Sequence, residues 1–159
     1  MTRWESYPKK YREMEVEQLI SAVQCGECAA VIGLSGAGKS NLLGFLAHRC
    51  ADRHPLVLVD CNRLASPDRN NFYRLISEAL CLNPADGEEI RALENTLGER
   101  LQPEGARLCL LFDRFDALPA GLSAVIHGGL RALRDSHKYQ LTLITATRHA
   151  LPLDSELAE

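Results

Sequence analysis

The eight residues from Gly33 to Ser40 follow the phosphate-binding loop pattern G-x-x-x-x-G-K-[ST], directly after an apolar run from Cys28 to Ile32. Glycines in such a loop let consecutive backbone N–H groups turn inward around phosphate oxygens, and the following helix directs its positive dipole end at the same anion. The pattern therefore predicts a strand, a loop that binds a nucleoside triphosphate, and a helix that begins at Lys39. The residues expected to hold the nucleotide are Gly33, Ser35, Gly36, Ala37, Gly38, Lys39, Ser40 and Asn41.

Two loop side chains and a distant acid complete the predicted site. Lys39 is expected to reach the β- and γ-phosphates, and the Ser40 hydroxyl is expected to bind Mg²⁺. The third apolar run of the chain, 108–112, ends at Asp113. Ligands collect at the carboxyl ends of parallel strands, so we expect Asp113 to hold Mg²⁺ beside Ser40, directly or through water. The chain has no Asn-Lys-x-Asp segment, which favours ATP over GTP.

Hydrolysis needs a further group that orients or deprotonates the attacking water. Arg114 stands directly after Asp113, and an arginine stays protonated at any accessible pH. Asp116 is the nearest substitute base, although it could equally cap the turn before Pro119. The sequence thus predicts a weak ATPase whose site binds nucleotide well and turns it over slowly.

A fourth apolar run ends in Thr145, Ala146, Thr147 and Arg148. Thr145 and Arg148 could contact the γ-phosphate and report its presence, or they could form a solvated strand end. On the preceding helical segment, Arg131 and Arg134 could reach a neighbouring subunit's nucleotide. A solvated helix face is the interpretation we favour for those two arginines.

Helical apolar spacing alternates with short continuous apolar runs along the chain. Continuous runs are typical of strands covered on both faces, and the alternation implies right-handed crossovers in a parallel sheet. We therefore predict a three-layer α/β fold with helices on both faces, in a single domain over residues 1–159 whose ends, 1–10 and 152–159, are flexible. Strands are expected at 28–32, 56–60, 108–112 and 141–145, and helices at about 11–24, 39–50, 72–80, 90–101 (with Asp86 as N-cap) and 122–134.

Composition narrows the class of protein. The chain is 46% apolar and 25% charged, as expected of a globular domain, and no apolar run is long enough to cross a bilayer. The charged start is no signal peptide, so a cytoplasmic protein is expected. A net charge of −3 argues against a general nucleic-acid binder. The six cysteines suggest reduced thiols, although Cys25 and Cys28 could form a zinc half-site or a redox motif.

Several segments together resemble the ATPase domain of AAA-type STAND proteins and of origin-recognition-like AAA+ ATPases. The resemblance is carried by Arg12-Glu13-Met14-Glu15, the loop at 33–40, the segment 113–118 and the strand end 145–148, in this order. It covers nearly the whole chain and implies a sheet of about four strands in the order 1-4-3-2, with the loop-bearing strand at an open edge. By this resemblance Arg12 and Glu13 lie near the adenine or the first segment of the domain, Asp113 is the Walker B acid, and Thr145 or Arg148 is sensor 1.

Two departures from the family pattern shape the expected function. Arg114 stands where relatives often carry glutamate, and the chain stops before the usual fifth strand and helical lid. The resemblance therefore implies a truncated ATPase core that acts as a nucleotide-dependent signalling switch, and that self-associates or receives the rest of its site from a partner. The alternatives are a DNA-associated AAA+ factor (an initiator, loader or transposition regulator) and a small-molecule P-loop kinase.

Overall fold

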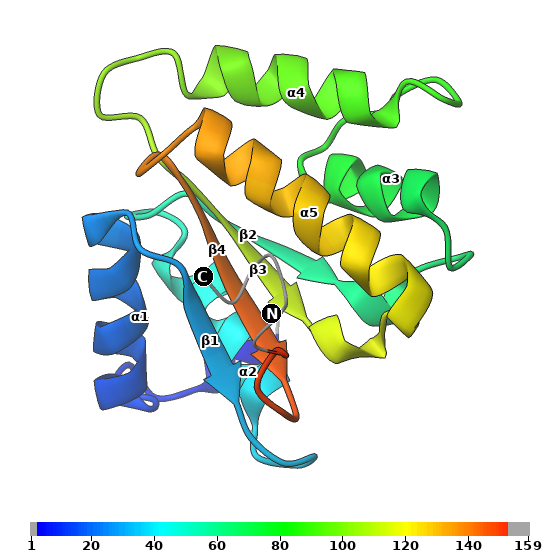
Figure 1. Ribbon diagram of the computed structural model, residues 1–159. Helices are drawn as coiled ribbons and strands as arrows, with labels where there is room; N and C mark the ends of the chain where they lie inside the picture. The colour runs from blue at the N-terminus through cyan, green and yellow to red at the C-terminus, as the bar shows by residue number, and fades with distance from the viewer. Residues whose placement is uncertain (1–2, 153–159) are drawn as a thin grey trace.

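A computed structural model describes residues 3–152, and its centre is a parallel sheet of four strands (Figure 1). The strands are β1 (Ala29–Ile32), β2 (Leu56–Asp60), β3 (Leu108–Asp113) and β4 (Leu141–Thr147), and their order across the sheet is β1-β4-β3-β2. Every neighbouring pair is parallel. The expected strand order 1-4-3-2 is therefore confirmed, and all four carboxyl ends lie at one edge of the sheet.

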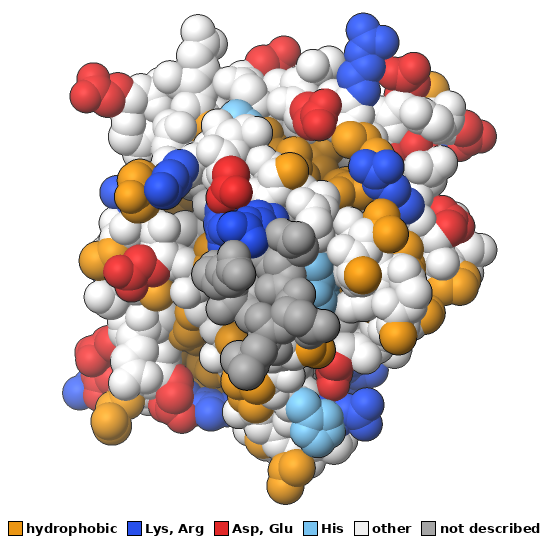
Figure 2. All heavy atoms as spheres, in the orientation of Figure 1, with side chains coloured by type: hydrophobic (Ala, Val, Ile, Leu, Met, Phe, Trp, Pro, Cys, Tyr) orange, Lys and Arg blue, Asp and Glu red, His pale blue; other side chains and the backbone are white. Residues whose placement is uncertain are grey.

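Helices cover both faces of the sheet, as predicted. One face is covered by α1 (Glu13–Cys25) and α2 (Lys39–Phe45), and α2 continues as a π-helical turn at Leu46–Cys50. The other face is covered by α3 (Arg69–Ala79), α4 (Glu89–Arg100) and α5 (Ala120–Ser136) (Figure 1). Acidic and basic side chains are interspersed over the face of the molecule seen in Figure 2. No helix within residues 3–152 combines the length and apolar character that a membrane crossing would need.

The two faces of the sheet carry separate cores. Leu111 and Ile144 pack with α1 and α2, whereas Phe112 and Leu143 pack with the three helices opposite. All residues of β3 and β4 are buried, because both strands have neighbours on both sides and helices above and below. This explains why their sequences are apolar runs without alternation.

The residues of strand β1 alternate between half-buried and exposed, and Ile32 is 52% exposed. Within the described residues, β1 pairs with β4 alone. The loop-bearing strand therefore lies at an open edge of the described sheet, as the family resemblance implied. An open edge presents unpaired N–H and C=O groups to other chains.

One local prediction was wrong, and one helix is longer than expected. Asp86 does not cap α4, because its carboxylate pairs with Arg74 at 2.6 Å and the helix begins after Glu88 without a side-chain cap. The helix expected at 122–134 is longer, since α5 runs from Ala120 to Ser136 through the Gly128-Gly129 pair. Gly129 has a packing reason there: a Cβ at this position would overlap the hydroxyl of Tyr73.

The first ten residues were expected to be a flexible linker. In the structure, side chains of residues 3–10 pack against the rest of the domain. Arg3–Ser6 forms a short 3-10 helix, and the Trp4 ring stacks on His48 with centroids 5.8 Å apart. Of the tail that was expected to be flexible, 152–159, all but Pro152 lies outside the described residues. All six cysteines are free thiols, and no group of three potential metal-ligating side chains occurs within residues 3–152.

Candidate nucleotide-binding site

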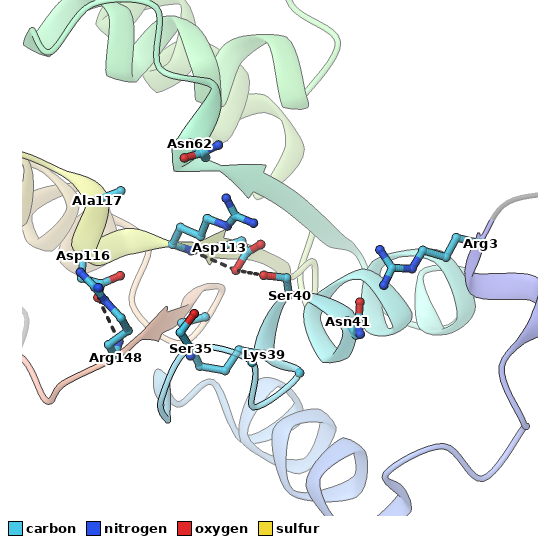
Figure 3. A pocket seen from close by; sticks show the side chains of 14 residues that line it. Arg3, Ser35, Lys39, Ser40, Asn41, Asn62, Asp113, Asp116, Ala117 and Arg148 are labelled. Carbon is cyan, nitrogen blue, oxygen red and sulfur yellow. Dashed lines mark hydrogen bonds and ion pairs between the residues drawn. The ribbon is translucent and has the colours of Figure 1, made fainter.

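A cleft of about 610 Å³ opens at the carboxyl edge of the sheet (Figure 3). Its volume suits a small-molecule ligand. Segments that follow β1, β2, β3 and β4 converge on it, together with the first turn of α2 and the N-terminal 3-10 helix. The residues that line it are Arg3, Ser35, Gly36, Gly38, Lys39, Ser40, Asn41, Asn62, Asp113, Arg114, Asp116, Ala117, Ala146 and Arg148.

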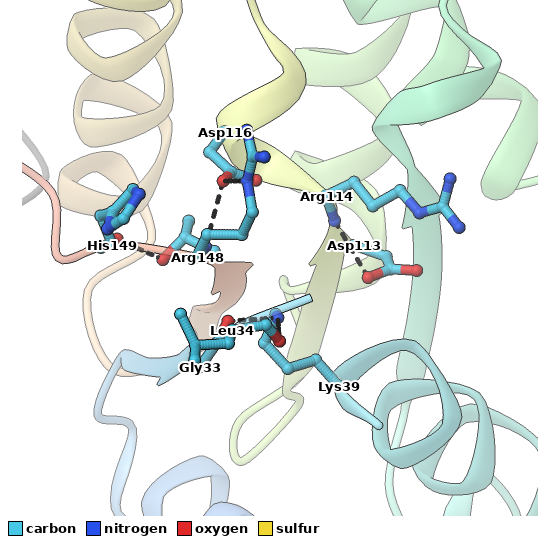
Figure 4. Close-up of polar contacts among 9 residues, drawn as sticks. Gly33, Leu34, Lys39, Asp113, Arg114, Asp116, Arg148 and His149 are labelled. Carbon is cyan, nitrogen blue, oxygen red and sulfur yellow. Dashed lines mark hydrogen bonds and ion pairs between the residues drawn. The ribbon is translucent and has the colours of Figure 1, made fainter. Parts of the chain in front are cut away.

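The Gly33–Ser40 loop forms the floor of this cleft. Gly36 and Gly38 have φ angles of 83° and 80°, in the left-handed region where side chains are strained. A Cβ at Gly36 would meet nothing within 4 Å, so the loop leaves open space for a ligand. Lys39 Nζ donates to the carbonyl oxygens of Gly33 and, at 2.9 Å, Leu34 (Figure 4). The lysine is thus folded over the loop, where it can exchange these carbonyls for phosphate oxygens.

Ser40 and Asp113, both predicted to hold Mg²⁺, meet in the cleft. The Ser40 hydroxyl donates to Asp113 Oδ1 at 3.0 Å, and the backbone N–H of Arg114 donates to the same oxygen at 3.0 Å. Asp113 is only 7% exposed, at the end of the fully buried strand β3. A hydroxyl and a carboxylate are oxygen ligands of the kind that Mg²⁺ takes alongside nucleotide phosphates. The two side chains therefore fit the predicted metal position.

The position after Asp113 is occupied by Arg114, whose φ of 52° places it in the left-handed region. Asp116, the substitute base considered from the sequence, is held by Arg148 (Figure 4). The Arg148 backbone N–H and Nε donate to Asp116 Oδ2 at 3.0 and 3.1 Å. Burial tends to raise the pKa of Asp116, but these hydrogen bonds hold it below the ordinary value. One of its two carboxylate oxygens, Oδ2, is therefore engaged by Arg148.

Of the two residues predicted to sense the γ-phosphate, only Arg148 lines the cleft. Thr145 is 5% exposed and pairs in register with Phe112 of β3. It lies two residues before the end of β4, because the strand extends to Thr147 rather than stopping at 145. Ala146 lines the cleft in its place.

The side chains of Arg12 and Glu13 lie in different surroundings. Arg12 Nη1 donates to the carbonyl oxygen of Ala37 in the loop at 3.1 Å, whereas Glu13 pairs with Lys10 at 3.5 Å away from the cleft lining. Glu15 holds Arg12 in place through contacts of 3.0 Å to Nε and 2.9 Å to Nη2. The second acid of the Arg-Glu-x-Glu segment, rather than the first, therefore positions the arginine on the loop.

Some of the predicted site residues do not line the cleft, and some residues that line it were not predicted. Gly33 and Ala37 shape the loop without lining the cleft, while Arg131 and Arg134 pair with Asp135 on their own helix at 3.7 and 3.1 Å. Arg3 and Asn62 line the cleft and were not predicted. Four of the lining residues are cationic and two are acidic, an excess that suits a polyphosphate. The cations are Arg3, Lys39, Arg114 and Arg148, and the acids are Asp113 and Asp116.

The sheet order, the glycine-rich loop after β1 and the acid at the end of β3 together define a P-loop NTPase. The particular family follows from its sequence model: the chain belongs to the AAA domain family, whose model matches residues 24–152. It is thus an AAA-type ATPase domain, and domains of this family bind nucleotide together with Mg²⁺. No curated protein matches the sequence at a significant level.

Solved structures with the same fold include Cdc6 and ORC proteins at low sequence identity. Cdc6p from Pyrobaculum aerophilum superposes with a TM-score of 0.65 at 19% identity, over 91% of this chain and 41% of that one. The Aeropyrum pernix ORC1 protein in complex with DNA gives 0.61 at 18% identity, over 87% and 39%. A chain of Drosophila ORC bound to DNA gives 0.58 at 16%, over 92% and 79%. The chain thus spans about two fifths of the length of the Pyrobaculum aerophilum and Aeropyrum pernix chains.

Proposed function

We propose that this domain is an ATP- and Mg²⁺-binding switch that hydrolyses its nucleotide slowly. The observation that carries the proposal is that neither of the two positions where a catalytic base could stand holds a free carboxylate. Arg114 occupies the position after Asp113, and Asp116 accepts two hydrogen bonds from Arg148. The loop and the Ser40–Asp113 pair contain the groups that nucleotide and Mg²⁺ binding need, whereas a free base that would activate the attacking water is lacking at these two positions.

Binding is assigned to the loop and its first helical turn. Lys39 would exchange the carbonyls of Gly33 and Leu34 for β- and γ-phosphate oxygens. Ser40 and Asp113 would hold Mg²⁺, which when bound bridges the phosphates and spreads their charge. The N–H groups of the loop and of Asn41 would face the phosphates nearer the nucleoside. A cytoplasmic location, expected from the sequence, remains a prediction.

The switch itself is assigned to Arg148. Its side chain is 61% exposed in the cleft and uses only Nε in its bond to Asp116. A guanidinium has four further N–H donors, which can bind phosphate oxygens. With ATP bound, these further donors would bind the γ-phosphate while the backbone N–H and Nε keep their bonds to Asp116, and the movement of Arg148 would shift the turn Phe115–Ala117 to which Asp116 belongs. With ADP bound, the turn would keep its present position.

Substituting Arg148 with alanine is expected to weaken ATP binding by roughly tenfold, because a charged hydrogen bond to the γ-phosphate is lost. ADP affinity should change little, since ADP has no γ-phosphate. Isothermal titration calorimetry with Mg·ATP and Mg·ADP measures both affinities on the same preparations.

The matched control for this experiment is Arg91→Ala, which removes an arginine that is 77% exposed on α4 and absent from the cleft lining. It should leave both affinities unchanged. Equal losses of ATP and ADP affinity in Arg148→Ala would contradict the assignment of Arg148 to the γ-phosphate.

The open edge of β1 supports a further part of the proposal, namely self-association or a partner chain or domain that supplies an additional strand. Parallel pairing along β1 would satisfy the edge groups that β4 does not reach. Nucleotide-dependent self-association would appear in sedimentation velocity as a larger species with ATP than with ADP. Identical profiles with both nucleotides would argue for a separate partner.

A DNA-associated AAA+ factor is the second candidate. It is supported by the fold shared with chains solved in DNA complexes from Drosophila and Aeropyrum pernix. The net charge of −3 and the interspersed charges in Figure 2 favour it less than the switch. It predicts a DNA complex that forms only with ATP and weakens steeply with salt. Membership of the AAA family argues against the small-molecule kinase.

A further inference from the structure

The N-terminal strap, residues 3–11, is bound to the same helix that carries the phosphate-binding loop. Trp4 stacks on His48 at 5.8 Å, and Tyr11 packs against Phe45 at 5.2 Å. Arg49 Nη1 donates to three strap carbonyl oxygens at 3.1 to 3.3 Å, those of Trp4, Glu5 and Tyr7. Ring stacking and charge-assisted hydrogen bonds together fix the strap to α2 and its π-helical extension.

Gly44 provides the seat for Trp4. A Cβ at this position would overlap three atoms of the indole ring, so only glycine lets the ring lie against the helix. Gly44 is buried and lies four residues after Ser40, on the same helix. The contact surface for Trp4 and the end of the phosphate loop therefore lie on the same helix, α2.

Arg3 extends from the strap into the nucleotide cleft. Its guanidinium carbon lies 5.3 Å from the centre of the Trp4 ring, and the side chain lines the cleft together with Asn41. Figure 3 shows Arg3 at one end and Arg148 with Asp116 at the other, with Lys39 and Ser40 between them. If the γ-phosphate lies at the Arg148 end, the Arg3 end receives the part of the nucleotide nearer the nucleoside.

We propose that Arg3 is a nucleotide-contacting residue that binds the phosphates shared by ATP and ADP, and that its contact couples nucleotide occupancy to docking of the N-terminal strap. This inference rests on the proposed nucleotide site. A guanidinium matches phosphate geometry with paired N–H donors and is always charged. Because Trp4 positions Arg3, nucleotide that engages Arg3 stabilises the seated state of Trp4 on Gly44.

The first test is the affinity of the Arg3→Ala variant. It is expected to lose roughly tenfold in affinity for both Mg·ATP and Mg·ADP, because one charged hydrogen-bonding group is removed from phosphates that both ligands carry. Lys9→Ala, an exposed cation of the same strap outside the cleft lining, is the matched control and should bind normally. Unchanged affinity in Arg3→Ala, or a loss confined to ATP, would overturn the proposal.

The second test uses Trp4 as a reporter, since it is the only tryptophan of the chain. ATP and ADP should each lower acrylamide quenching of Trp4 fluorescence, and Arg3→Ala should remove this protection at saturating nucleotide. Calorimetry on the same samples distinguishes loss of nucleotide binding from loss of the coupling between nucleotide and strap. Nucleotide that binds without protecting Trp4 overturns the coupling alone, whereas absence of binding overturns the nucleotide site as well.

The Gly44→Ala variant tests whether the seat positions Arg3. Displacing Trp4 should reduce nucleotide affinity as much as Arg3→Ala does, and the double variant should lose no more than either single one. Such non-additivity is expected only of residues that act through one contact. Additive losses would show that Gly44 acts through the fold of α2 instead. Thermal unfolding of each variant identifies losses that come from misfolding.

Discussion

Nucleotide binding is expected to disappear when Lys39 is replaced by alanine. The ammonium group belongs to a residue of the loop itself, and it already bonds the carbonyl oxygens of Gly33 and Leu34. Two charged hydrogen bonds to β- and γ-phosphates are worth about 3 kcal/mol or more, so affinity for Mg·ATP should fall at least about 100-fold. Calorimetry, or competition against a fluorescent ATP analogue, measures this loss.

Lys138→Ala is a suitable control for the lysine experiment. Lys138 lies over the Tyr139 ring beyond the end of α5, and it is absent from the cleft lining. Its removal should leave affinity unchanged. Lys39→Ala should also fold normally, because the lost bonds join a lysine to exposed loop carbonyls rather than to the core. Undiminished affinity in a folded Lys39→Ala protein would contradict the phosphate-loop assignment itself.

The parts of the site that the sequence predicted are those fixed by local spacing and strand ends. The loop residues are consecutive, so their shared location needs no tertiary information. Asp113 was predictable because it closes a fully buried apolar run, and parallel strands end at the same edge of the sheet. The same logic placed Arg148 correctly at the cleft.

What the sequence did not predict depends on packing between distant segments. Arg3 lines the cleft, and the adjacent Trp4 finds space on Gly44, a complementarity that no local pattern encodes. Thr145 does not line the cleft because β4 extends to Thr147, beyond the apolar residues that marked the strand. Asn62 lines the cleft from within a short 3-10 turn, Cys61–Arg63, which Asp60 stabilises by accepting from the Asn62 N–H at 3.0 Å. That turn follows a strand at the same edge, a signal that could have identified Asn62.

Replacing Arg114 with glutamate is expected to raise the rate of ATP hydrolysis by about tenfold or more, because a positioned general base contributes on the order of 100-fold when its geometry is good. The wild-type rate should be about 0.01 per second or slower, as in P-loop proteins without an efficient base. The left-handed backbone of Arg114 does not oppose the change, since glutamate carries no more strain there than arginine. Phosphate release at saturating Mg·ATP measures the effect without interference from altered affinity.

A neutral variant separates the base from the loss of positive charge. Arg114→Met keeps an unbranched side chain beside Asp113 and supplies no carboxylate, so its rate should stay near that of the wild type. An equal rise in both variants would mean that the Arg114 charge suppresses hydrolysis, and an unchanged or lower rate in Arg114→Glu would argue against a missing base. Asp116→Asn in the Arg114→Glu background completes the comparison. Since Asp116 is already engaged by Arg148, its removal should leave the gained activity in place.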